Sequence, residues 1–244
     1  MVIAAPDKSL KIIGRTTPDD RQYRDMVVLL YSFNSIFYFH ACAGVIVKPR
    51  AVLTAAHCPI GDAVNQWRMR AGSKAAHSGG VVHTFSSYII HPSFNEASFM
   101  DCDLAIMRTN NPIMYTVHVQ PAHLAGGNYV LQDNEMVWAT GWGATSLSGP
   151  RSELLQHVQI WTINHAICNS RYETLSQIVT DNMICSGWLD VGLRDQCHGD
   201  SGGPLYHNGV VVGICSWGEE CAHPEYPGIN VDLRKFRSWM DSNI

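Results

Sequence analysis

The sequence predicts an all-β protein that ends in a short helix. Runs of β-branched and aromatic residues recur along the chain and are clearest at 26–31, 44–47 and 81–84. Gly, Pro and Asn residues break these runs, and several runs lie about ten residues apart, which is typical of a β-sandwich or a β-barrel. The last run, 231–243, instead places its apolar residues at helical spacing with basic residues outside them. We therefore expect a short amphipathic helix there.

The composition is that of a folded protein. Of the 244 residues, 46% are hydrophobic and 16% are charged, which excludes a disordered chain. A net charge of −4 gives no reason to expect nucleic-acid binding. No apolar run reaches the length of about 18 residues that spans a membrane. Eight cysteines favour an oxidising compartment, although a cytosolic enzyme can hold as many as thiols.

Residues 1–11 are interpreted as the remnant of a propeptide. The apolar start from Met1 to Ala5 is too short for the core of a secretory signal, which takes about 7–15 apolar residues. A cytosolic protein conflicts with the cysteines and with the motifs below. We therefore expect a secreted protein whose signal peptide is missing from this sequence.

One stretch, residues 194–205, holds a serine in the surroundings of a nucleophile. Ser201 lies in Gly-Asp-Ser-Gly-Gly-Pro, and at neutral pH its hydroxyl needs a base to take its proton. Gly199 lets the backbone approach a substrate, so that the N–H groups of Gly199 and Ser201 can face a developing oxyanion. Asp200, between them, is an acid that is costly to bury without a partner.

A base, and an acid to orient it, stand earlier in the chain. His57 lies in Leu-Thr-Ala-Ala-His-Cys, and Asp101 and Asp103 stand before the apolar run 104–107. In the order His, Asp, Ser, these segments resemble the trypsin-family serine proteases of the chymotrypsin fold, from Ile12 to the C-terminus. The order is informative because unrelated folds carry the same three groups in other orders.

The resemblance implies a fold and a reaction. It implies two antiparallel Greek-key β-barrels, an N-terminal half at 12–120 and a C-terminal half with the helix at 121–244. These form one peptidase unit, 12–244, with the crossover at 110–121. It also implies peptide hydrolysis through an acyl-enzyme by a monomer that uses no cofactor or metal. Protein protease inhibitors are possible partners, and nucleic acid and membranes are not expected ones.

The resemblance assigns the catalytic roles. His57 takes the proton of Ser201 and later protonates the leaving amine, while Asp103 fixes the imidazole tautomer and stabilises its charged form. Asp103 immediately precedes the apolar run, where the family has its acid. We expect the competing acid, Asp101, to be solvated.

The resemblance also places a substrate pocket. Asp195 stands six residues before Ser201, where trypsins carry a carboxylate that pairs with Arg or Lys of the substrate. The residues that match the walls of this pocket are Ser216, Trp217, Gly218 and Gly228.

Four residues depart from the usual pattern of the family. Gln196 is bulkier than the usual Ser or Ala beside the pocket acid, so we expect Arg to be preferred over Lys as the residue before the cut. Glu219 and Glu220 stand at the expected pocket mouth, and Ala43 replaces a common Gly.

The resemblance further implies activation by cleavage after Lys11. The new α-amino group of Ile12 would fold inward and pair with Asp200, so the uncut chain is expected to be nearly inactive. Arg15 stands where the family has Gly and is expected to alter how the new terminus inserts. His40 is a candidate partner for Asp200 before the cut.

The cysteines cannot be paired from the sequence, because eight of them allow about 105 connectivities. The resemblance supplies three bridges, Cys42–Cys58, Cys168–Cys185 and Cys197–Cys221. We expect Cys102 and Cys215 to be buried thiols rather than a fourth bridge. Residues 68–87 contain no Asp or Glu, so the acidic calcium loop of vertebrate trypsins is not expected.

Local segments such as Leu30-Tyr31-Ser32 and residues 78–83 and 205–209 resemble trypsin-like proteases of moths and butterflies. This implies an enzyme that digests food protein or degrades yolk or other storage protein. One alternative is a regulatory protease of a limited-proteolysis cascade. A second is an inactive homologue that acts as a binding protein, which the intact His57, Asp103 and Ser201 disfavour.

Overall fold

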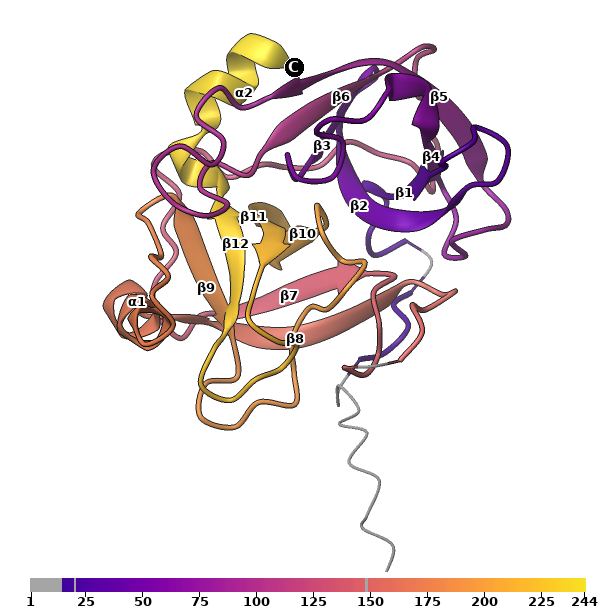
Figure 1. The fold of residues 1–244 in the computed structure, drawn as a ribbon. Helices are drawn as coiled ribbons and strands as arrows, with labels where there is room; N and C mark the ends of the chain where they lie inside the picture. Colours follow the sequence, from indigo (N-terminus) through magenta and orange to yellow (C-terminus); the bar gives the residue numbers. More distant parts are fainter. Residues whose placement is uncertain (1–14, 20, 148) are drawn as a thin grey trace, which may run out of the picture.

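The protein folds into two closed antiparallel β-barrels, which lie next to each other in Figure 1. This computed structural model describes residues 15–19, 21–147 and 149–244. The first barrel has the strand order β1-β2-β3-β6-β5-β4, and the second has the order β10-β11-β12-β9-β8-β7. The predicted fold of two antiparallel barrels with a C-terminal helix is therefore confirmed.

The first barrel consists of β1 (Met26–Tyr31), β2 (Phe39–Lys48), β3 (Ala51–Thr54), β4 (Trp67–Ala71), β5 (Val81–Ile90) and β6 (Ala105–Thr109), with a 3₁₀ turn η1 (Val64–Gln66) before β4. The second consists of β7 (Met136–Gly141), β8 (Gln156–Ile163), β9 (Met183–Gly187), β10 (Pro204–His207), β11 (Val210–Trp217) and β12 (Gly228–Asp232). A helix that the sequence did not predict, α1 (His165–Glu173), lies between β8 and β9 and begins with an Asn164 side chain that accepts from Ile167 N–H.

Strand β1 contributes to the packing between the two barrels. Side chains alternate between the two faces of a strand, and both faces of β1 are buried. Val27 and Leu29 belong to the core of the first barrel, whereas Val28 packs in a cluster with Trp142 and Leu155 of the second half. The barrels are thus joined by apolar packing, which fixes their relative position.

The C-terminal helix is shorter than the predicted 231–243. Val231 pairs with Ile214 of β11 and so belongs to strand β12. A 3₁₀ turn, η2 (Leu233–Lys235), follows, and α2 (Arg237–Asn243) begins only after it. Phe236 and Met240 are buried in the core cluster of the first barrel. The helical spacing was read correctly, but pairing within the second barrel fixes the first residues of the segment as strand.

Three disulfides join Cys42 to Cys58, Cys168 to Cys185 and Cys197 to Cys221. The first ties β2 to the loop that carries His57, and the third ties the segment before Ser201 to the loop after β11. Cys102 and Cys215 are buried free thiols. Each bridge contributes about 2–4 kcal/mol to the free energy of unfolding.

Candidate active site

His57 and Asp103 meet between the loop after β3 and the start of β6. Nδ1 of His57 lies 2.6 Å from Oδ2 of Asp103, and the His57 backbone N–H donates to Oδ1 over 2.8 Å. The Ser216 hydroxyl donates to Oδ2 over 2.5 Å, and Asp103 is fully buried. Since Nδ1 faces a carboxylate, it carries the proton, and Nε2 is left as the basic nitrogen.

Ser201 is held where the two barrels touch. Its carbonyl accepts from Ala43 N–H of β2 over 2.8 Å, and the next N–H, of Gly202, donates to Cys215 O over 2.8 Å. Gly202 has φ +78, and a Cβ there would lie 2.1 Å from Oγ1 of Thr54 and 2.4 Å from the backbone oxygen of Ala43. Glycine is therefore required after the serine, because the backbones approach too closely for a side chain.

The predicted nucleophile, Ser201, and the predicted base, His57, do not form a hydrogen bond with each other. The hydrogen bonds of the described residues include none between Nε2 of His57 and Oγ of Ser201, while Sγ of Cys58 lies 3.9 Å from both His57 Nε2 and Ser201 O. Such catalytic hydrogen bonds often tighten only once substrate is bound.

The segment before Ser201 is fixed from two sides. Gly199 has φ +101, a conformation that favours glycine, and its carbonyl accepts from Nε2 of His40 over 2.9 Å. Burial is the main cause that lowers the pKa of His40 to about 4, so His40 is a neutral donor. His40 therefore donates to the Gly199 carbonyl and does not pair with Asp200. Asp200 forms an ion pair with Arg15 instead. Lys11 and Ile12 lie outside the described residues.

Asp195 lies at the base of a pocket that reaches Ser201. The pocket has a volume of about 190 Å³, and its lining includes all the predicted pocket residues: Asp195, Gln196, Ser216, Trp217, Gly218 and Gly228. Oδ1 of Asp195 accepts from Gln196 N–H over 2.8 Å, and Oδ2 accepts from Ala222 N–H over 3.1 Å. A Cβ on Gly228 would lie 2.7 Å from Oδ1, so the absence of a side chain there leaves the carboxylate open to the pocket.

Burial changes the pKa of the Asp195 carboxyl. Burial raises its pKa from 3.8 to about 7, while the N–H groups of Ala222 and Gln196 and the charge of Arg15 lower it. The rise means that burial outweighs these favourable contacts. A cation entering the pocket would favour the ionised form.

Three further side chains shape the pocket. Nε2 of Gln196 is buried and has no hydrogen-bond partner among the described residues. Glu220 is exposed at the mouth. Phe99, which the sequence analysis missed, also lines the pocket and packs edge-to-face on Trp217 with ring centroids 5.4 Å apart. The sequence signal for Phe99 was an aromatic residue in a largely polar loop close to Asp103.

The prediction that Asp101 is solvated is wrong. Its side chain is buried and accepts from Thr180 Oγ1 over 2.5 Å and from Asn182 Nδ2 over 3.1 Å. Both donors belong to the second half of the chain, so Asp101 links the two barrels. The thiol of Cys102 also donates to it over 3.4 Å. These contacts depend on which segments meet across the interface, and the spacing of the two acids gives no sign of them.

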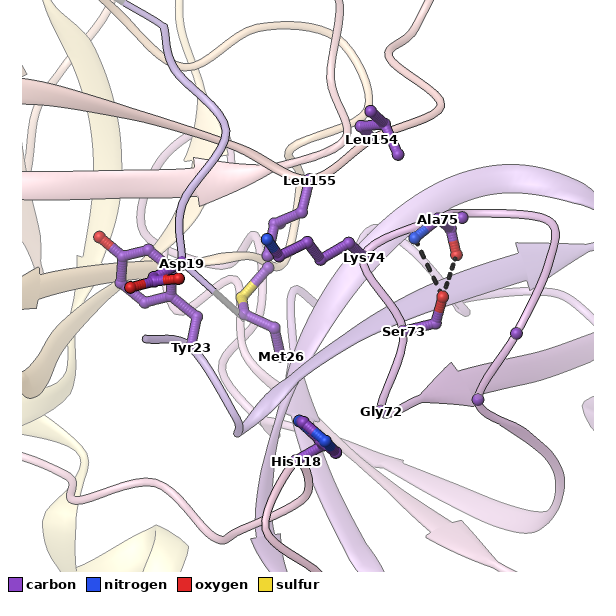
Figure 2. A pocket seen from close by; sticks show the side chains of 12 residues that line it. Asp19, Tyr23, Met26, Gly72, Ser73, Lys74, Ala75, His118, Leu154 and Leu155 are labelled. Carbon is purple, nitrogen blue, oxygen red and sulfur yellow. Dashed lines mark hydrogen bonds between the residues drawn. The ribbon is translucent and has the colours of Figure 1, made fainter. Parts of the chain in front are cut away.

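A second hollow, of about 390 Å³, lies outside this site (Figure 2). Tyr23, Met26 and Leu155 line it, and none of the predicted catalytic residues does. Ser73, on its wall, is bonded locally to the backbone N–H and carbonyl of Ala75.

Two clusters within the described part of the chain have the spacing of metal ligands. They are Cys42, His57 and Cys58, and Cys197, His198 and Cys221. The cysteines of both clusters are disulfide-bonded, so no thiolate is available to a metal. In the described ranges, no helix is long and apolar enough to cross a membrane.

Comparison with known proteins gives consistent matches. Residues 12–240 match the protein family described as Trypsin. The alkaline trypsins C and A of Manduca sexta are each 56% identical over 242 residues, which cover 99% of this chain and 94% of each relative. Trypsin CFT-1 of Choristoneura fumiferana is 51% identical over 242 residues, with the same two coverages of 99% and 94%.

Proposed function

We propose that this chain, which belongs to the trypsin family and is a trypsin-like serine endopeptidase, is a secreted digestive enzyme. We further propose that it cuts polypeptides after Arg or Lys. The observation that carries the specificity is the Asp195 carboxylate, 2% exposed, at the base of a pocket that also contains Ser201. A buried carboxylate needs a cation. A substrate Arg or Lys reaching past Trp217 and Gly218 supplies one.

The hydrogen bonds of His57 support the proposed catalytic roles. Its Nδ1 is occupied by Asp103, so Nε2 takes the proton of Ser201 as Oγ attacks the peptide carbonyl. The protonated imidazole then gives that proton to the leaving amine, and Asp103 stabilises its charge in the meantime. Water repeats the same steps on the acyl-enzyme and releases the acid product.

The oxyanion is assigned to the N–H groups of Gly199 and Ser201. The positive φ of Gly199 and the bond from His40 to its carbonyl fix the peptide planes in this segment. Donors that are already fixed stabilise the charge of the tetrahedral intermediate without reorganising during the reaction.

Secretion and a digestive role are supported by the disulfides, by the names of the relatives and by the small number of lysines. Three disulfides suit an oxidising compartment, and the relatives from Manduca sexta are named alkaline trypsins. Only five of the basic residues are lysine, namely Lys8, Lys11, Lys48, Lys74 and Lys235. Arginine keeps its charge at a higher pH than lysine, which favours a protein that works in an alkaline fluid.

Two anilide substrates that differ only in the residue before the cut test the specificity. We expect an Arg anilide to be hydrolysed with a kcat/KM at least about a thousandfold above that of a Leu anilide. The Ser201→Ala variant provides the blank for both substrates. Equal turnover of the two anilides would contradict the proposal.

The ratio of these two kcat/KM values should depend on pH. Only ionised Asp195 pairs with a substrate cation, and its pKa in the free enzyme is about 7. The Arg-to-Leu ratio should therefore fall by about tenfold from pH 8 to pH 6, because the ionised fraction falls by that factor. Any group that acts alike on both substrates cancels in the ratio. A ratio that is constant over this range would show that Asp195 does not titrate there.

A further inference from the structure

Arg15 directs a buried guanidinium to the segment before the nucleophile. The backbone beside it is anchored, because Thr16 N–H donates to His157 O of β8 over 3.0 Å and His157 N–H donates back over 2.9 Å. The Arg15 side chain is 4% exposed. Its Nη2 pairs with Oδ2 of Asp200 and donates to the Asp195 carbonyl over 3.1 Å. One side chain thus touches both the pocket base and the acid next to Ser201.

The carboxylate of Asp200 has a space shaped for it. Its side chain is 3% exposed, Oδ1 accepts from Gly143 N–H over 2.7 Å, and Oδ2 accepts from Cys197 N–H over 2.8 Å. A Cβ on Gly143 would lie 2.5 Å from Cγ of Asp200, so a larger residue there would displace the acid. Two backbone donors do not neutralise a buried charge, and the guanidinium of Arg15 does.

The position of Asp200 makes this pair relevant to catalysis. Asp200 stands between Gly199 and Ser201, whose N–H groups are assigned to the oxyanion. Holding its side chain inward fixes the rotation of both neighbouring peptide planes. The described residues of the uncut chain have this arrangement. His40 Nε2 donates to Gly199 O, and His57 Nδ1 donates to Asp103.

We propose that Arg15 is a positioning residue: by pairing with Asp200 in the uncut chain, it holds the Gly199–Ser201 segment ready for catalysis and gives that chain activity of its own. This inference rests on the proposed function. It replaces the expectation that the uncut chain is nearly inactive, because the cation that Asp200 needs is already present without a new N-terminus at Ile12.

The groups around the pair decide how it responds to pH. The titratable groups that face it are Asp195, His40, Arg151 and Cys215. Above pH 8, His40 is neutral, since its pKa is lowered to about 4, and Asp195 is ionised. Burial raises the pKa of Cys215 well above its usual value and lowers that of Arg151. Both groups are present in every variant below, so they cancel in the comparison.

The test measures kcat/KM for an Arg anilide at pH 8 with Lys11→Gln in every protein, so that the chain stays uncut, and mass spectrometry verifies the N-terminus. We expect Arg15→Gly to lower kcat/KM by about 100-fold and Arg15→Lys to recover at least a tenth of the parent value. Arg21→Gly, at an exposed arginine of the same segment, is the matched control and should leave kcat/KM unchanged.

The decline of kcat/KM at alkaline pH distinguishes a positioning role of Arg15 from a contribution to folding alone. An amine has an ordinary pKa of about 10.4 and a guanidinium one above 12. Pairing with Asp200 raises the amine's value, so its stabilisation is complete below about pH 10 and is lost as pH rises through the raised value. As pH rises, the uncut Arg15→Lys variant should therefore lose activity at a lower pH than the Arg15 parent. If kcat/KM of the Arg15→Lys variant and of the Arg15 parent declined at the same alkaline pH, the positioning role would be overturned.

Two further outcomes contradict the proposal in different ways. If the uncut parent has no activity while the chain cut after Lys11 is active, Arg15 does not replace a new N-terminus and the proposed function stands. If Arg15→Gly equals the uncut parent, the pair with Asp200 has no effect on catalysis. Inactivity of both the cut and uncut chains would instead reject the proposed function itself, and the inference with it.

Discussion

Replacing Ser201 by alanine should lower kcat for peptide hydrolysis by about a million-fold while leaving the fold intact. In the proposed mechanism the hydroxyl oxygen of Ser201 attacks the carbonyl, and its removal leaves His57 and Asp103 with no nucleophile to activate. Among the described residues Oγ of Ser201 makes no hydrogen bond, whereas the backbone of Ser201 keeps its bond from Ala43 N–H. The temperature of unfolding should therefore change little.

A matched control is Ser242→Ala in α2, an exposed serine far along the chain, which should retain full activity. The measurement is burst and steady-state hydrolysis of the Arg anilide by both variants. Turnover by Ser201→Ala within about tenfold of the parent would place the nucleophile elsewhere.

Changing Asp195 to serine should reduce kcat/KM for Arg and Lys substrates by about a thousandfold or more. The substrate cation would then enter the pocket without a carboxylate to pair with. A Leu substrate makes no such pair, so its kcat/KM should change by no more than about threefold. Both substrates are assayed at pH 8, where the Asp195 carboxyl of the parent is ionised.

The Leu substrate is the internal control for this variant. An equal loss on Arg and Leu substrates would show that Asp195 supports the fold of the pocket and does not select the substrate. A loss confined to Lys would point to Gln196, whose Nε2 has no partner among the described residues and, like the Asp195 carboxylate, lies close to Gly228.

The parts of the site that are local in sequence were the predictable ones. Short β-branched runs and frequent turns predicted the all-β fold, and the resemblance carried by residues 194–205 and by His57 predicted two barrels. Asp103 was distinguished from Asp101 by its place next to strand β6, and the structure has Asp103 on His57. These inferences needed no knowledge of which distant segments touch.

Contacts across the barrel interface were not predictable in this way. Asp101 was expected in solvent and is bonded to Thr180 and Asn182. His40 was a candidate partner of Asp200 and lies on Gly199 O. Arg15 was noted only as a departure from the family, and its side chain reaches an acid 185 residues away. A sequence records neither these separations nor the direction in which a side chain turns.

The most direct test of the account is a set of peptides identical except for the residue before the cut. The chain is incubated with the set at pH 8, and the products are identified by mass spectrometry. We predict cleavage after Arg and Lys only, with Arg faster than Lys because Gln196 takes up space beside Asp195. Cleavage that is equally fast after Leu or Phe would contradict the assignment of Asp195 as the residue that selects the substrate.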